Sequence, residues 1–294
     1  MMGVCTLRGA AALTHFRQFA AIDWSGAKGS RHKGIAVALC HAGEEAPRLV
    51  SPPGRWWSRT EVCAWLRDHA HEPLLVGIDC SFSAPFLARG AHLPGETRTE
   101  TARALWAYVD EQSSDEDLGA ASFLEARRGR HFYLGAADGP KAQFLHWRTC
   151  EMVGDRSTKP TTVYDAIGAA QVAKASFAGM RMLHHLDGAL AIWPFDSKPD
   201  EGAVLVEIYT AMAARAAGLP RGRSKLRDAV SLDDALGHLG SRPHEPLTQY
   251  DDHSTDAILA AAWLRANADR ADLWVPPGLD AQVRQTEGWT FGVT

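Results

Sequence analysis

The stretch that decides the fold is Phe19-Ala-Ala-Ile-Asp23-Trp-Ser-Gly26, in which an apolar run ends in an aspartate and a polar turn. A second apolar run, Gly34-Ile-Ala-Val-Ala-Leu39, follows the glycine-containing loop. Two β-rich runs joined by such a loop predict a hairpin with Asp23 at the end of its first strand. Aspartate often caps a turn, and for Asp23 taken alone that explanation is better than a metal ligand.

Another apolar run, Pro73-Leu-Leu-Val-Gly-Ile-Asp79, also ends in an aspartate. A predicted helix over residues 60–69 precedes it, and a strand–helix–strand order indicates a parallel neighbour in the sheet. In open α/β sheets, sites form at the carboxyl ends of such strands. Two strands that each end in aspartate therefore indicate a site more strongly than either strand does alone.

Further acidic positions follow in the second half of the chain. Glu207 interrupts the predicted strand Ala203-Val-Leu-Val-Glu207-Ile-Tyr209. A glutamate is almost never fully buried unless it is paired, so we expect Glu207 to be paired, metal-bound or at a strand end. Asp252 and Asp256 open an Ala/Leu-rich helix and share one face. The helix dipole explains Asp252 better than it explains Asp256.

Carboxylates spread along a chain in this way suit Mg²⁺ or Mn²⁺, which prefer oxygen ligands. Two such ions about 4 Å apart would activate a water and stabilise the leaving oxygen in phosphodiester hydrolysis. The predicted catalytic residues are Asp23, bridging both metals, with Glu207 on one metal and Asp256 or Asp252 on the other. The full set of predicted metal ligands is Asp23, Asp79, Glu207, Asp252 and Asp256.

Two other classes of hydrolase are disfavoured by the motifs of the chain. The sequence has no H-E-x-x-H helix motif, which disfavours a zinc hydrolase. It also has no G-x-S-x-G motif, which disfavours an α/β-hydrolase triad.

The charge of the chain limits how it could hold a nucleic acid. The formal net charge of the 294 residues is -4, so there is no global attraction to a polyanion. A nucleic acid would have to be held by a local basic patch or through metal ions. The candidate phosphate contacts, each of which is more commonly an ordinary surface charge, are Lys28, Arg148, Lys159 and Lys225.

Cysteine usage and hydropathy bear on where the protein works. The five cysteines are scattered and form no CxxC pair, which argues against a disulfide framework and fits a reducing cytosol. No run approaches the ~20 apolar residues of a membrane span. We therefore expect a cytoplasmic protein that has no membrane partner.

The composition of the chain differs between its segments. Residues 86–140 combine a predicted helix with acidic and then basic, aromatic stretches, which predicts a helical insertion. We expect the core to comprise residues 17–85 and 141–270. A poorly ordered leader is expected over residues 1–16, and a C-terminal tail that packs on the core over residues 271–294.

Seven short motifs occur in an order that resembles domain-of-unknown-function family 429, whose members are predicted ribonuclease H-like nucleases. The motifs are Ile22-Asp-Trp-Ser25, Gly77-Ile-Asp-Cys-Ser-Phe-Ser-Ala-Pro85, Arg148-Thr-Cys-Glu151, Val163-Tyr164 with Gly168-Ala, Trp193-Pro-Phe-Asp196, Val206-Glu-Ile-Tyr209 and Asp252-His-Ser-Thr-Asp-Ala257. The resemblance runs from about residue 17 to 266 and is thin across the insertion.

This resemblance implies both a fold and a site. The fold would be α/β and ribonuclease H-like, a mixed sheet flanked by helices whose first strand pairs with the second in a hairpin. The site would be built from Asp23, Glu207 and Asp256, with Asp79 and Asp252 nearby. The chain departs from the family pattern at Thr210, where a proline would be expected after the Glu-x-Tyr motif.

Three functions are consistent with these features. The preferred one is a divalent-metal-dependent nuclease that hydrolyses phosphodiester bonds in DNA or RNA. An ATP-dependent phosphotransferase of the same fold superfamily is an alternative, although the chain is short for the second matching domain that such proteins usually need. The third is a non-catalytic module that binds nucleic acid or protein, in which the acids would be helix caps and buried pairs.

Overall fold

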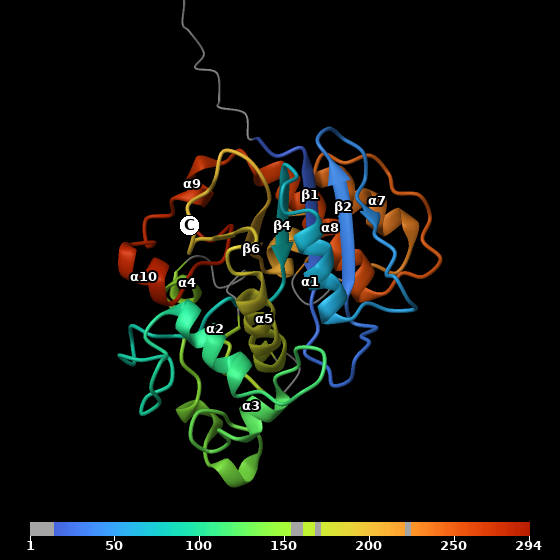
Figure 1. Cartoon of the computed structure of the whole chain (residues 1–294). Coiled ribbons are helices and arrows are strands. Elements are labelled where there is room, and N and C mark those ends of the chain that lie inside the picture. Colours follow the sequence, from blue (N-terminus) through green and yellow to red (C-terminus); the bar gives the residue numbers. More distant parts are fainter. Residues whose placement is uncertain (1–14, 154–160, 168–171, 221–224) are drawn as a thin grey trace, which may run out of the picture.

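The computed structural model describes residues 15–153, 161–167, 172–220 and 225–294 (Figure 1). At the centre of the described chain is a six-stranded mixed sheet with the order β3-β2-β1-β4-β6-β5. The strands are β1 (Gln18–Asp23), β2 (Ala36–His41), β3 (Arg48–Leu49), β4 (Leu74–Ile78), β5 (Ala191–Trp193) and β6 (Val204–Glu207). Most of the predicted leader, residues 1–14, lies outside the described residues.

The predicted hairpin is present, because β1 and β2 pair in an antiparallel register with Asp23 opposite Ala36. The remaining neighbours from β1 to β5 run parallel: β1 with β4, β4 with β6, and β6 with β5. The second strand begins at Ala36, two residues after the start of the apolar run that predicted it. The backbone at residues 32–35 instead turns and bridges to Trp57, so it is not available to the ladder with β1.

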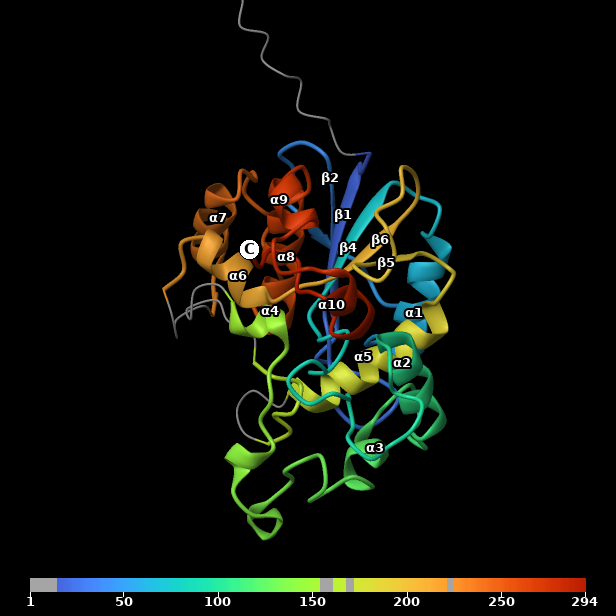
Figure 2. The ribbon, with the colours of Figure 1, turned by 90° about the vertical axis from the view of Figure 1, so that its left-hand side faces the viewer.

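Helices cover both faces of the sheet (Figure 2). One face carries α1 (Arg59–Asp68), α2 (Ala102–Glu111) and α5 (Val172–Leu186), and the other carries α6 (Thr210–Ala216), α7 (Ala229–His238) and α8 (Asp252–Asn267). The shorter α-helices of the described chain are α3 (Ala121–Glu125), α4 (Thr149–Met152), α9 (Ala271–Trp274) and α10 (Ala281–Thr286), and two 3-10 helices span Ala136–Asp138 and Lys141–Gln143. None of the described helices is long and apolar enough to cross a membrane.

Alternation along β1 divides the core between the two faces, as a period of two requires. Ala20 and Ile22 belong to the apolar cluster that includes α1 and α5, whereas Phe19 and Ala21 belong to the cluster under α8. Helix α8 lies directly over β1, β2 and β4. Its Ala-rich body can approach the sheet closely, and this helix is the element that brings Asp256 to the edge where β1 and β4 end.

The segment predicted as an insertion is packed against the core. Helix α2 contacts α5, and the indole Nε1 of Trp106 donates to the carbonyl of Phe82 at 2.6 Å. Asp117, held at φ 46°, accepts from the backbone N–H groups of Arg59 and Thr60 at the start of α1. The acidic stretch after α2 therefore anchors a core helix.

The C-terminal tail lies on the core as well. Trp289 and Phe291 are buried, and the backbone at Thr290 bridges to Glu207 at the end of β6. The tail thus reaches the same edge of the sheet as the acidic residues.

Candidate functional site

Asp23 and Asp79 stand side by side where two parallel strands end. Ile22 of β1 is in register with Ile78 of β4, and the N–H of Asp79 donates to the carbonyl of Ile22 at 3.0 Å. The residues that follow this pair are the two aspartates, so the parallel register brings their side chains to one edge. The register thus places these two predicted metal ligands at the ends of neighbouring strands.

Asp256 joins them from the first turns of α8. Its carboxylate is near enough for the charge of Asp23 to raise its pKa, and Asp79 responds to both Asp23 and Asp256. Three carboxylates from two strands and one helix therefore converge, although more than 170 residues separate the second from the third.

Burial and crowding of like charges disfavour ionisation of these acids. Burial, followed by the charge of Asp23, raises the pKa of Asp79 to about 7. The same two causes raise the pKa of Asp256 to about 7. Burial also raises the pKa of Asp23, against the opposing effect of His253. Among the described residues, Asp79 and Asp256 have no ion pair to a basic side chain, so their negative charge is largely uncompensated.

His253 is a further member of the cluster that the sequence did not single out. Its Nδ1 lies 2.8 Å from Oδ2 of Asp23, and the hydrogen bond to Asp23 raises the pKa of the imidazole. An ionised Asp23 can only accept, so Nδ1 carries the proton in this pair. The imidazole therefore fixes the orientation of the Asp23 carboxylate.

Thr210 holds Asp79 in a comparable way. Its Oγ1 donates to Oδ2 of Asp79 at 3.0 Å. The departure from the expected proline at this position therefore has a structural consequence, because proline has no hydroxyl to offer. This departure was the one signal in the sequence that pointed to Thr210.

Glu207 is at the end of β6, but its carboxylate is already occupied, which corrects its prediction as a metal ligand and catalytic residue. The residue is 2% exposed. The guanidinium of Arg148 donates to both of its oxygens, at 2.8 and 2.5 Å, and the N–H of Phe82 and the hydroxyl of Thr290 also donate to them. A carboxylate with four such donors has no lone pair turned toward a metal ion.

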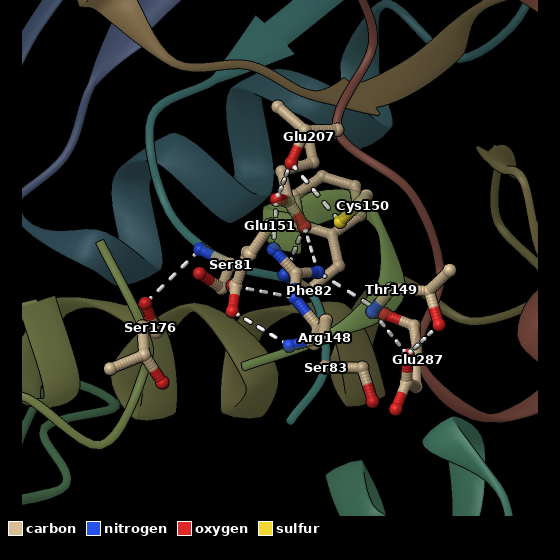
Figure 3. Close-up of polar contacts among 12 residues, drawn as sticks. Ser81, Phe82, Ser83, Arg148, Thr149, Cys150, Glu151, Ser176, Glu207 and Glu287 are labelled. Carbon is tan, nitrogen blue, oxygen red and sulfur yellow. Dashed lines mark hydrogen bonds and ion pairs between the residues drawn. The ribbon is translucent and has the colours of Figure 1, made fainter. Parts of the chain in front are cut away.

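Arg148 is likewise not placed to contact a phosphate, although it was predicted to do so (Figure 3). Its side chain is 0% exposed. Besides Glu207, it donates to Oε1 of Glu151 at 2.8 Å and to the carbonyl of Glu287 at 3.1 Å. Burial raises the pKa of Glu151 to about 7 despite this guanidinium. Arg148 is thus the centre of a buried ionic network behind the acidic cluster.

The carboxylate of Glu287 extends this network to the C-terminal tail. It accepts from the N–H and the hydroxyl of Thr149 on one oxygen and from the N–H groups of Phe86 and Leu87 on the other. The motif Arg148-Thr-Cys-Glu151 therefore joins three distant segments and has a structural role in the described chain.

The remaining predicted residues are placed differently. Asp252 forms ion pairs with Lys225 and with Arg227, the latter at 2.5 Å. Burial raises its pKa, but the hydrogen bonds from these two cations outweigh burial and lower it overall. Asp252 is thus paired with two cations, although its charge still contributes to raising the pKa of Asp23 and of Asp256.

Lys28 is exposed in the loop after β1 and lines a different cavity from the one that adjoins Asp79. The fourth predicted phosphate contact, Lys159, lies outside the described residues.

The site is open. A cavity of about 280 Å³ adjoins Asp79 and is lined in part by Trp24, Cys80 and Tyr209. Among the described residues, no three His, Cys, Asp or Glu side chains are grouped closely enough to hold a metal ion as they stand. The three aspartates therefore crowd one another electrostatically without forming a closed metal cage.

The donor set nevertheless fits an open site for a hard cation. Mg²⁺ usually keeps several waters and is held by one or two carboxylates together with substrate phosphates. Asp23, Asp79 and Asp256 offer carboxylate oxygens whose pKa values are raised first by burial and then by neighbouring carboxylates. A divalent cation would offset the repulsion between these carboxylates.

Comparison with known proteins gives no match for this chain. No protein-family model, no curated protein and no solved structure matches the chain significantly. What is shown is therefore the architecture itself, an α/β fold with a mixed sheet flanked by helices and an acidic edge.

Proposed function

We propose that this protein is a divalent-metal-dependent phosphodiesterase that acts on nucleic acid, and that its fold is ribonuclease H-like. The observation that carries the proposal is the convergence of Asp23, Asp79 and Asp256 with raised pKa values and without ion pairs to Asp79 or Asp256 in the described chain. The antiparallel hairpin beside parallel strands, with Asp23 where the first hairpin strand ends and the connecting loop begins, supports the proposed fold.

Asp23, Asp79 and Asp256 would hold Mg²⁺ or Mn²⁺. When bound, such an ion supplies an activated water and stabilises charge on the leaving oxygen. The chain itself orients the ligands: His253 holds Asp23 through Nδ1, and Thr210 holds Asp79 through its hydroxyl. Glu207, paired with Arg148, anchors the end of β6 and takes no part in this proposal as a ligand.

A cleavage assay tests the proposal directly. Fluorescently labelled single-stranded and duplex DNA and RNA are incubated with the protein and Mg²⁺ or Mn²⁺. We expect cleavage that is lost in Asp23→Asn and in Asp79→Asn and kept in Asp234→Asn, an exposed aspartate on α7. Equal cleavage by the wild type and Asp23→Asn would sink the proposal.

A second measurement tests metal binding without relying on activity. A cation that binds only the folded state raises the melting temperature by mass action. We expect Mn²⁺ to raise the melting temperature of the wild type and of Asp234→Asn, and to have much less effect on Asp79→Asn. An equal shift in all three proteins means that the cation binds elsewhere.

A further inference from the structure

A groove of about 330 Å³ lies along the edge of the sheet, next to the acidic cluster. Its walls come from β2, from the segment after β3 and from the start of α8. The lining residues that matter here are Lys33, Arg55, Trp56, Asp251 and His253.

The groove leads to the acidic cluster through His253. One side of this imidazole lines the groove, and its Nδ1 contacts Asp23 at 2.8 Å. The loop after β1 is close on the other side, since a Cβ built on Gly34 would lie 3.4 Å from Nε2 of His253 and 3.2 Å from Oγ of Ser25. A chain lying in the groove would therefore pass within one side chain of the site.

The groove combines aromatic surface with positive charge. Trp56 is 37% exposed, and the guanidinium carbon of Arg55 lies 4.6 Å from the centroid of its ring. Lys33 and Arg55 are exposed and have no acidic partner among the described residues. Asp251 is the acid on the wall, and one of its oxygens is engaged in capping α8 by accepting from the N–H of Ser254 at 2.9 Å.

The aromatic surface is held in place. The N–H of His32 donates to the carbonyl of Trp57 at 2.8 Å, and Nη1 of Arg31 donates to the carbonyl of Trp56 at 3.0 Å. Arg31 is itself paired with Glu61 of α1 at 2.5 Å. Trp56 therefore stands on a backbone segment that is tied to both the hairpin loop and a core helix.

We propose that this groove binds a single-stranded segment of nucleic acid beside the reacting phosphodiester, which rests on the function proposed above. Exposed aromatic and guanidinium planes stack with unpaired bases of any sequence, and lysines hold the backbone. Trp56 and Arg55 form the stacking surface, and Lys33 contacts phosphate. A duplex keeps its bases stacked on one another, so it cannot use this surface.

Binding is measured with the Asp23→Asn protein in EDTA, so that neither catalysis nor a metal contributes. Fluorescence anisotropy compares a labelled single strand with a duplex of the same length. We expect the single strand to bind more tightly. Trp56→Ala weakens its binding about 10-fold, because stacking on one aromatic ring is lost. Trp56→Phe restores most of the affinity, since it keeps a stacking plane.

Salt dependence separates the charged contacts from stacking. Each phosphate contact on a single strand contributes about 0.7 to the slope of log Kd against log salt. Lys33→Ala, which removes the phosphate contact, should therefore lower that slope by about 0.7. Arg270→Ala, which removes an exposed arginine of similar size far from the groove, is the matched control and should leave the slope unchanged.

The outcomes distinguish this inference from the function on which it rests. If wild type cleaves nucleic acid but Trp56→Ala binds and cleaves with unchanged Kd and KM, the groove is not the binding surface although the function stands. If Asp23→Asn binds single strands through Trp56 while wild type cleaves none, the groove stands and the nuclease does not. Tighter binding of the duplex, absence of single-strand binding, or equal competition by heparin overturns the groove proposal.

Discussion

Asp79 illustrates how one residue can be structurally costly and chemically useful. Within the described part of the chain, its neighbours offer a hydroxyl from Thr210 but no ion pair with a cation, and the charges of Asp23 and Asp256 act on it. The usual reason to retain such a group is function, because strongly perturbed acids cluster at sites where they act. The effect of Asp79 on the stability of the folded protein can be tested without knowing the substrate.

Because the pKa of Asp79 rises from 3.8 to about 7 on folding, the folded state favours its protonated form. The contribution of Asp79 to stability is therefore fully present below about pH 4 and is lost as the pH rises through about 7. Asp79→Asn should raise the melting temperature at pH 8 by at least about 2–4 °C, equivalent to about 1 kcal/mol. At pH 4 the gain should be absent. Thermal unfolding followed by circular dichroism checks this, and an equal gain at both pH values would contradict it.

Arg148, in contrast, is a charged residue with a structural role. Replacing it by methionine leaves Glu151 and Glu207 buried without their common partner. Loss of one member of a buried ion pair costs about 3–5 kcal/mol. Arg148→Met should lose about that much free energy of unfolding in urea, whereas Arg270→Met, which removes an exposed pair with Asp272, should change it by less than about 1 kcal/mol. A loss in Arg148→Met as small as that in Arg270→Met would show that the buried network is not needed.

At the scale of elements, the position of the site depends on how closely α8 and the end of β6 approach β4. Gly77 in the middle of β4 makes this approach possible. A Cβ at that position would lie 2.7 Å from Cγ2 of Ile208 and 2.8 Å from Cδ1 of Leu264. Ile208 and Leu264 both belong to the apolar cluster under α8, so the small residue is required on that face of the sheet. The glycine is needed for space and not for an unusual backbone conformation.

Gly77→Ala should destabilise the protein by about 1–3 kcal/mol through overpacking. Gly237, in α7, has no atom within 4 Å of a built Cβ. Gly237→Ala should therefore stabilise by about 1 kcal/mol through helix propensity. Chemical denaturation of the two variants measures both changes. A neutral Gly77→Ala would mean that α8 can move away from the sheet, and activity would then be expected to fall with the altered position of Asp256.

At the scale of the whole molecule, the tail completes the core near the site. Phe291 is buried against Trp193, Trp263 and Trp274, and its N–H donates to the carbonyl of Glu207 at 2.9 Å. Thr290 adds the hydroxyl that reaches the Glu207 carboxylate. The last residues of the chain therefore support the end of a strand that is more than 80 residues earlier.

Deleting residues 289–294 removes two buried aromatic side chains, each worth about 3–5 kcal/mol. The total exceeds the stability margin of many domains, so the truncated protein should be largely unfolded by circular dichroism at 25 °C. Deleting Thr294 alone, which is exposed, should leave the melting temperature unchanged. A cooperative melting transition in the longer deletion would show that the core closes without the tail.

Much of the fold was predictable from local patterns. The apolar runs ending at Asp23 and Asp79 identified two neighbouring strands, and the helix that carries Asp256 was predicted from its Ala/Leu-rich body. The prediction of an acidic edge followed, because parallel strands end on the same side. Boundaries were less accurate where a turn competed with the strand, as at residues 32–35.

The partners of the acids could not be predicted in this way. Glu207 and Asp256 look alike in sequence, since each is an acid next to an apolar run. In the folded chain, Glu207 meets a buried guanidinium, whereas Asp256 meets other carboxylates. Arg148 and Glu207 are 59 positions apart in the sequence. Whether two such residues pair depends on how the chain between them folds back to the sheet.

The sequence by itself thus determined the elements, the hairpin and the strand ends at which acids occur, because hydrophobic periodicity and turn residues act over a few neighbouring positions. Tertiary structure alone decided which acids remain uncompensated, that His253 and Thr210 orient two of them, and that a groove with Trp56 leads to them. The physical reason is that charge and solvation depend on surroundings in space. Those surroundings are assembled from segments that no local pattern brings together.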